Sequence, residues 1–155
     1  MFKHSVRATL ACTALALAST PAFAWNDTPV TGATVGVEQN PAASTPVRAV
    51  TDAKGKATFA KLGPGRYVVF FPELPERKDP FRVSVSSSGT GSFSCLLVKW
   101  PGAGHRVDLV GKDKQKLSFD IGRSGGQLQV SVATIPTPPK GKSLGAYTPC
   151  DGPAK

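Results

Sequence analysis

Apolar and polar residues alternate along most of the chain after residue 24, in short runs that predict β-strands. The alternation is cleanest in Lys116–Ile121 and Gln127–Val132, where every second residue is apolar. Phe93–Trp100 is more continuously apolar, which predicts a strand buried on both faces. The remaining predicted strands are Val30–Glu38, Val47–Thr51, Ala57–Phe59, Tyr67–Phe71, Phe81–Val85 and Val107–Val110.

No segment carries apolar residues at helical spacing over three turns, and 14 prolines and 16 glycines favour many tight turns. We therefore expect an all-β fold. Seven to nine short strands, a rough count, are typical of a two-sheet β-sandwich, and we assign this sandwich to residues 25–134. From Ile135 the composition shifts to Pro and Gly, so residues 135–155 are expected to form a semi-extended tail.

The first 24 residues have the three parts of a secretory signal peptide. Lys3 and Arg7 are followed by the apolar run Ala8–Ala18 and by the small-residue cleavage motif Ala22-Phe23-Ala24. The apolar run is shorter than the roughly 20 residues that a membrane-spanning helix needs. We expect cleavage before Trp25, a periplasmic or secreted mature protein, and no transmembrane segment in it.

Cleavage would change both the charge and the cysteine count. Loss of Lys3 and Arg7 leaves 17 basic and 10 acidic residues, a net charge of +7. Cys95 and Cys150 would be the only remaining cysteines. In an exported chain a pair of cysteines favours a disulfide, which here would pin the tail across the sandwich. The alternative is a buried thiol with a free cysteine in the tail.

A spaced motif runs through Gly32–Val37, Val50–Phe59 and Leu62–Val69. Its fixed positions are Thr51, Asp52, Gly55, Phe59, Leu62, Pro64, Gly65 and Tyr67. The motif resembles the carboxypeptidase-regulatory-like and Cna-B-like families, which share a prealbumin-like (transthyretin-like) β-sandwich. We expect Asp52 to accept backbone hydrogen bonds in the turn that follows it, and Gly55 to adopt a positive φ. The resemblance implies a fold and no particular reaction.

Enzymes with related folds need residues that this chain lacks. Intradiol dioxygenases bind iron through two Tyr and two His, whereas the mature chain would keep only His105. Hydroxyisourate hydrolases end in a Tyr-Arg-Gly-Ser motif, which is absent here. His105 is also the only imidazole available as a base for a Ser or Cys nucleophile, and it has no nucleophile motif beside it. We expect no catalytic residues, no metal ligands and no cofactor.

Clustered basic residues are the remaining feature with a chemical meaning. Lys54, Lys56, Lys61 and Arg66 follow one another with no acid among them, which makes them candidates for anion binding. Arg106, Lys112, Lys114 and Lys116 form a second basic group, tempered by Asp108 and Asp113. Both groups are also compatible with a solvated face. Nucleic acid is a poor candidate partner because no aromatic residues are interleaved with these cations.

These observations favour an exported, non-catalytic binding module of the cell envelope. Its ligand would be an anionic polysaccharide, a lipid head group or a protein partner. Trp100 and Tyr147 are candidates for a sugar-stacking platform, although a Trp at a strand end is more typical of a sandwich edge. Two alternatives remain: a small exported hydrolase that uses His105, and an accessory subunit of an envelope or surface assembly.

Overall fold

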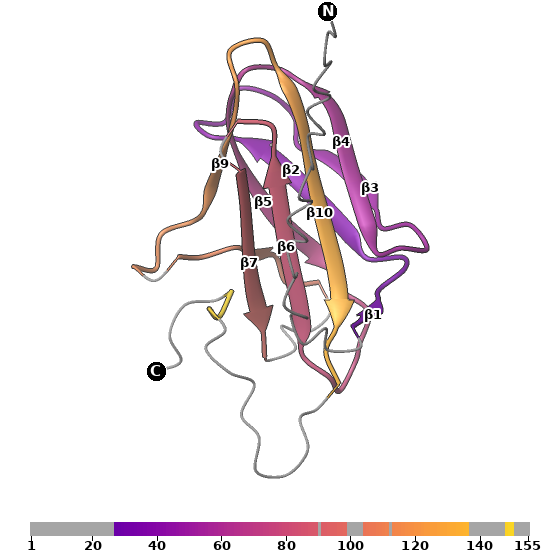
Figure 1. The fold of residues 1–155 in the computed structure, drawn as a ribbon. Helices are drawn as coiled ribbons and strands as arrows, with labels where there is room; N and C mark the ends of the chain where they lie inside the picture. Colours follow the sequence, from indigo (N-terminus) through magenta and orange to yellow (C-terminus); the bar gives the residue numbers. More distant parts are fainter. Residues whose placement is uncertain (1–26, 90, 99–103, 112, 137–147, 151–155) are drawn as a thin grey trace, which may run out of the picture.

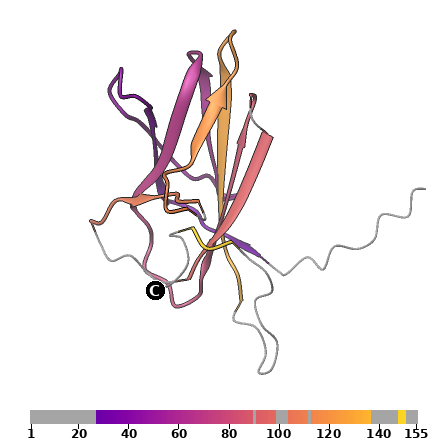
Figure 2. The same cartoon turned by 90° about the vertical axis from the view of Figure 1, so that its left-hand side faces the viewer.

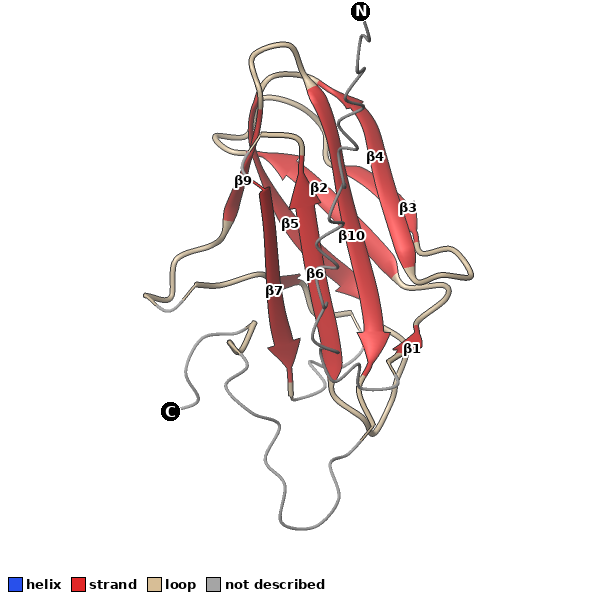
Figure 3. Ribbon diagram, viewed as in Figure 1, coloured by secondary structure: helices blue, strands red, loops and turns tan. Residues whose placement is uncertain are grey.

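The fold was analysed in a computed structural model, which describes residues 27–89, 91–98, 104–111, 113–136 and 148–150. These residues form ten β-strands in two antiparallel sheets, and they contain no helix (Figures 1 and 3). The predicted all-β, two-sheet sandwich is therefore confirmed. In the described part of the chain there is accordingly no helix of the length and hydropathy needed to cross a bilayer.

One sheet, called sheet A, is built around the last long strand of the chain. Its members are β1 (Thr28–Pro29), β4 (Lys56–Leu62), β6 (Phe81–Ser87), β7 (Gly91–Leu97) and β10 (Gly126–Thr134). Strand β10 is central, because it pairs with β6 on one side and with β4 and β1 on the other. Strand β7 pairs with β6 and lies at the edge of the sheet.

The second sheet, sheet B, packs against sheet A. Its members are β2 (Thr34–Gln39), β3 (Val47–Val50), β5 (Gly65–Glu73), β8 (Val107–Asp108) and β9 (Ser118–Ile121). Strand β3 lies at one edge, followed by β2 and β5, and the short strands β8 and β9 pair with different parts of β5. The chain changes sheet between β3 and β4 and again between β4 and β5.

The alternating runs fold as the sequence predicts. In β10 the apolar residues Leu128, Val130 and Val132 are buried, and the intervening residues are partly exposed. The same pattern in β4, β6 and β9 points one face of each strand into the core between the sheets. Burying each such Val, Leu or Phe side chain is worth about 1.5–3 kcal/mol, so this shared interior is the main source of stability.

Strand β7 departs from the prediction for Phe93–Trp100. It ends at Leu97 and lies at a sheet edge, so its first half is largely exposed, and only Cys95–Leu97 are buried in succession. The prediction of a strand buried on both faces is therefore wrong for the first half of the strand. Residues 99–103 lie outside the described residues.

The turn between β3 and β4 has the conformation that the motif predicts. The carboxylate Oδ1 of Asp52 accepts hydrogen bonds from the backbone N–H of Lys54 at 2.8 Å and of Lys56 at 2.9 Å. The bond from Lys56 has the largest effect and lowers the pKa of Asp52. Desolvation acts in the opposite direction and is outweighed by this bond together with the bond from Lys54 and the charges of both lysines. Gly55 has a φ of 70°, and a Cβ there would lie 2.4 Å from the carbonyl oxygen of Val132. Only glycine fits this position without a shift of the backbone.

Residues 148–150 close the open side of the sandwich at β7 (yellow in Figures 1 and 2). On sheet A, Leu96 donates its N–H to the carbonyl of Thr148 at 2.8 Å, and Cys150 donates to the carbonyl of Leu96 at 2.9 Å. Toward sheet B, Val110 donates to the carbonyl of Cys150 at 2.7 Å. Cys95 and Cys150 form a disulfide with a Cα–Cα distance of 4.9 Å, and both are buried in the core. The predicted disulfide is confirmed, and this segment is joined to β7 of sheet A and to the residues that follow β8.

Candidate functional site

The outer face of sheet B is the surface turned away from sheet A, and it carries an apolar floor under polar side chains. In β5, Val69 and Phe71 point into the core, so Val68 and Phe70 point outward. Both outward residues are nevertheless buried, with 5% of Val68 and 3% of Phe70 exposed. Arg106 covers the Phe70 ring, and Val68 lies between its pairing partners Glu38 of β2 and Ser118 of β9.

Phe70 depends on a glycine in the neighbouring strand. Gly36 of β2 is the Cα partner of Phe70, and a Cβ at Gly36 would lie 2.3 Å from the Phe70 ring. The ring therefore occupies the space that any other side chain would fill. On its other side the Arg106 guanidinium carbon lies 4.0 Å from the ring centroid, a cation–π contact.

Arg106 is held between two carboxylates. It donates to Glu38 of β2 at 2.6 Å and to Asp108 of β8 at 3.0 Å. Asp108 also pairs with the ammonium group of Lys116 at 3.0 Å. Partial burial lowers the pKa of Arg106, but the hydrogen bonds to Glu38 and Asp108 outweigh it and raise the pKa above its ordinary value. The guanidinium group is a permanently charged, oriented element of this face.

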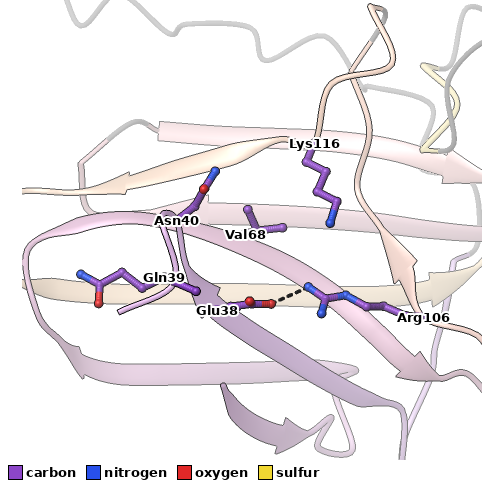
Figure 4. Close-up of a pocket in the computed structure, with 7 residues that line it drawn as sticks. Glu38, Gln39, Asn40, Val68, Arg106 and Lys116 are labelled. Carbon is purple, nitrogen blue, oxygen red and sulfur yellow. Dashed lines mark hydrogen bonds and ion pairs between the residues drawn. The ribbon is translucent and has the colours of Figure 1, made fainter. Parts of the chain in front are cut away.

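A hollow of about 190 Å³ opens beside this cluster (Figure 4). Lys116 reaches toward it from one side, and the Glu38–Arg106 pair forms another side. Its lining residues are Glu38, Gln39, Asn40, Ala42, Val68, Arg106 and Lys116. The Asn40 amide is oriented by a hydrogen bond from Nδ2 to the hydroxyl of Ser118 at 3.2 Å. Amide, carboxylate and cationic groups thus converge on a space that is open to solvent.

Several donors and acceptors in this hollow remain available to a ligand. A guanidinium group has five N–H donors, and two from Arg106 bind Glu38 and Asp108. The ammonium group of Lys116 has one carboxylate partner among the described residues and can donate three bonds. The carbonyl oxygen of Asn40 can accept a hydrogen bond from a hydroxyl group, whereas the Gln39 amide points away from this space (Figure 4). The arrangement suits a small polar ligand that carries a negative charge.

The four cations that the sequence grouped for anion binding are separated into two pairs. Lys54 and Lys56 lie at the start of β4, and Lys61 and Arg66 lie beside the turn at its other end. Strand β4 has seven residues, which places the two ends about 20 Å apart. All four residues are exposed, and none forms an ion pair with a described residue. The four residues do not form one patch.

The pair at the far end of β4 lies closer to the hollow. Lys61 has a positive φ of 58° within a β-bulge, where the pairing of β4 with β10 shifts register. Arg66 is two residues from Val68 in β5 and therefore points to the same outer face. Its backbone carbonyl accepts the N–H of Asn40 at 2.8 Å. Arg66 thus lies on the same outer face as the hollow without being one of its lining residues, whereas Lys54 and Lys56 lie at the other end of β4.

His105 is exposed in the segment before β8. It forms no hydrogen bond with a Ser or Cys of the described residues, and both described cysteines are joined in the disulfide. No group of three or more potential metal ligands gathers within the described ranges. Trp100 and Tyr147, the candidates for a sugar-stacking platform, lie outside the described residues.

The sequence indicated only part of this site. Arg106 and Lys116 were in the second basic group, but Glu38, Asn40 and Phe70 were not identified. One signal was present: Tyr67–Phe71 is an unbroken run of apolar residues, which implies a strand covered on both faces.

Comparisons of the chain with models of known families, with curated proteins and with solved structures find no match.

Proposed function

We propose that this chain is an exported, non-catalytic β-sandwich module that binds an acidic polysaccharide of the cell envelope. The observation that carries the proposal is the hollow on the outer face of sheet B, where Arg106 and Lys116 line one space together with Glu38. Arg66 lies on the same face, outside the lining. The excess of basic over acidic residues in the whole chain supports an anionic partner. The buried disulfide supports an oxidising compartment, as in the periplasm or outside the cell.

The size and lining of the hollow favour one sugar unit of a longer polymer. Its volume of about 190 Å³ is below the roughly 300 Å³ at which pockets for whole drug-sized ligands begin. A uronate unit presents a carboxylate for Lys116 and Arg106, and hydroxyls for the amide of Asn40. The aromatic ring of Phe70 is covered by Arg106, so recognition would rest on polar contacts rather than on ring stacking.

A lipid head group fits the same charges less well. Binding to a bilayer surface usually adds apolar side chains that enter the acyl region. The exposed large apolar residues of the described chain are Val47, Val50 and Val98, and none of them lines the hollow. The polysaccharide is therefore the better candidate.

We also propose that the sandwich is of the prealbumin-like type and that the chain is a distant relative of the carboxypeptidase-regulatory-like domains. The support is the agreement between motif and structure. Thr51 donates its hydroxyl to the Val30 carbonyl at 2.6 Å and accepts the N–H of Ala33 at 2.9 Å. Tyr67 donates to the Gly63 carbonyl at 3.2 Å. These bonds give the motif positions structural roles.

The proposal is tested by retention of the protein on immobilised polygalacturonate, with neutral dextran and anionic phospholipid vesicles as comparison surfaces. The site variant is Arg66→Gln/Lys116→Gln. The matched control is Arg77→Gln/Lys78→Gln, which removes the same charge from the exposed segment between β5 and β6. Loss of two charged contacts of about 1 kcal/mol each should weaken retention of the site variant more than tenfold. The control should lose at most the small, salt-sensitive effect of net charge.

Three results would contradict the proposal. Equal weakening by both variants would mean that retention follows net charge alone. Stronger binding to vesicles than to polygalacturonate would favour the lipid. Hydrolysis of an ester or amide substrate that His105→Ala abolishes would favour the hydrolase alternative.

A further inference from the structure

Strand β3 (Val47–Val50) is an edge strand of sheet B, and the peptide groups on its outer side have no partner strand among the described strands. It pairs with β2 alone among the described strands. The edge of sheet A at β7 differs, because residues 148–150 form backbone hydrogen bonds with Leu96 there. An edge strand exposes peptide groups that can pair with another extended chain.

The hydrogen-bond pattern identifies which peptide groups of β3 point away from the sheet. Just beyond the strand, Thr51 donates its N–H to the carbonyl of Ala33 at 3.0 Å, which marks a hydrogen-bonded pair. Such pairs alternate along an antiparallel ladder, so Ala49 also bonds toward β2. The N–H and C=O groups of Arg48 and Val50 therefore point to the open side.

The side chains of β3 alternate in character as well as in direction. Val47 and Ala49 pair with the core residues Val37 and Val35 and share their inward face, whereas Arg48 pairs with Gly36 on the outer face. Val47 is 49% exposed and Val50 is 60% exposed, two of the three exposed large apolar residues of the described chain. The edge thus offers apolar surface on both sides of a single cation.

We propose that β3 binds an extended segment of a partner protein, which adds as a further strand to sheet B. Main-chain bonds to Arg48 and Val50 would supply the affinity, and the alternating side chains would supply the specificity. The segment carries an acidic residue opposite Arg48 and β-branched apolar residues on either side of it, opposite Val47 and Ala49. The charge of Lys54, in the turn after β3, and of Lys56, at the start of β4, favours the same acidic partner.

Charge also argues against a second copy of this chain as the occupant. Two β3 strands paired edge to edge would bring Arg48 and the following lysines of both copies close together, and like charges across a ladder are destabilising. The short length of β3 and Pro46 just before it restrict indiscriminate pairing. An acidic segment offsets this repulsion, whereas a neutral or basic segment does not.

The test uses the whole protein and a synthetic peptide of sequence Thr-Thr-Val-Glu-Val-Thr, blocked at both ends. A second peptide has Lys in place of Glu, and a third carries an N-methyl group on the Glu nitrogen. Binding is followed by NMR, as slower amide exchange at Arg48 and Val50. The Glu peptide should slow exchange at these two amides, and the other two peptides should bind at least fivefold more weakly, since one removes the charge match and the other a ladder bond.

Charge reversal gives the matched comparison. Arg48→Glu should reverse the preference, so that the Lys peptide binds better than the Glu peptide. Arg123→Glu, the same change in the exposed turn between β9 and β10, should leave the preference for the Glu peptide intact. Equal binding of both charged peptides to the wild type, or protection of other strands only, would overturn the proposal. Protection of Arg48 and Val50 without peptide in a dimeric protein would show that a second copy occupies the edge.

Discussion

Removal of the disulfide should cost a large part of the stability of this domain. The sequence separation of Cys95 and Cys150 is 55 residues. For a loop of this length the chain-entropy model gives a stabilisation of about 4 kcal/mol, through restriction of the unfolded chain. Domains of this size are stable by only about 5–15 kcal/mol. The variant Cys95→Ala/Cys150→Ala should therefore lower the free energy of unfolding by about 4 kcal/mol.

A second contribution comes from the backbone contacts of residues 148–150. Their three hydrogen bonds to Leu96 and Val110 contribute about 0.5–1.5 kcal/mol each when they persist. If the segment leaves the sandwich once the covalent link is gone, this energy is lost as well. The free energy of unfolding of the double variant is then lower than that of the wild type by more than about 4 kcal/mol.

The measurement is urea unfolding followed by far-UV circular dichroism. The wild type with reductant present throughout serves as the control, since it removes the crosslink without changing the sequence. Reduced wild type and the double variant should agree within about 1 kcal/mol, because both lack the same constraint. A double variant as stable as the oxidised wild type would refute the reasoning, since it would mean that the disulfide does not restrict the unfolded chain.

Two further predictions concern individual positions. Gly36→Ala should lower the free energy of unfolding by about 1–3 kcal/mol, as in other overpacked sites, because the new methyl group meets the Phe70 ring. The variant should also be retained less on polygalacturonate, since Arg106 packs on that ring. An unchanged free energy of unfolding in urea and unchanged retention would contradict this prediction. Asp52→Ala should destabilise the protein at neutral pH, and the difference from wild type should shrink as the pH falls below about 3.9. The direction of this change follows from the pKa of the Asp52 carboxyl group, which is lower in the folded than in the unfolded protein. Its contribution to the free energy of unfolding is therefore present above the unfolded pKa and is lost as the carboxylate is protonated. Melting curves from pH 7 to pH 2.5 test this, and a constant difference would be the contrary result.

The sequence predicted the individual strands and turns better than it predicted how they are placed relative to one another. Alternation located β9 and β10, because each strand must choose one face for the core. The motif around Asp52 and Gly55 predicted its turn, because its hydrogen bonds join residues at most four positions apart. The distance between Lys54 and Lys61 was not predictable in this way, since it depends on the strand β4 that lies between them.

The site on the outer face depends on contacts between residues far apart in the chain. Arg106 meets Glu38 across a sequence separation of 68 residues, and alternation carries no information about such a partner. The apolar run around Phe70 indicated that something covers the outer face of β5. It did not indicate that a guanidinium group would do so.

The order in which the strands leave the ribosome has a consequence for how this protein folds. The central strand of sheet A is β10, so β1, β4 and β6 have no common partner until residues 126–134 have been synthesised. Cys150 then completes the core and its crosslink. A nascent chain cannot bury its interior early, and folds dominated by such distant contacts form slowly. Under the export proposed above, a translocation channel that accepts only extended polypeptide would therefore receive this chain before it has folded.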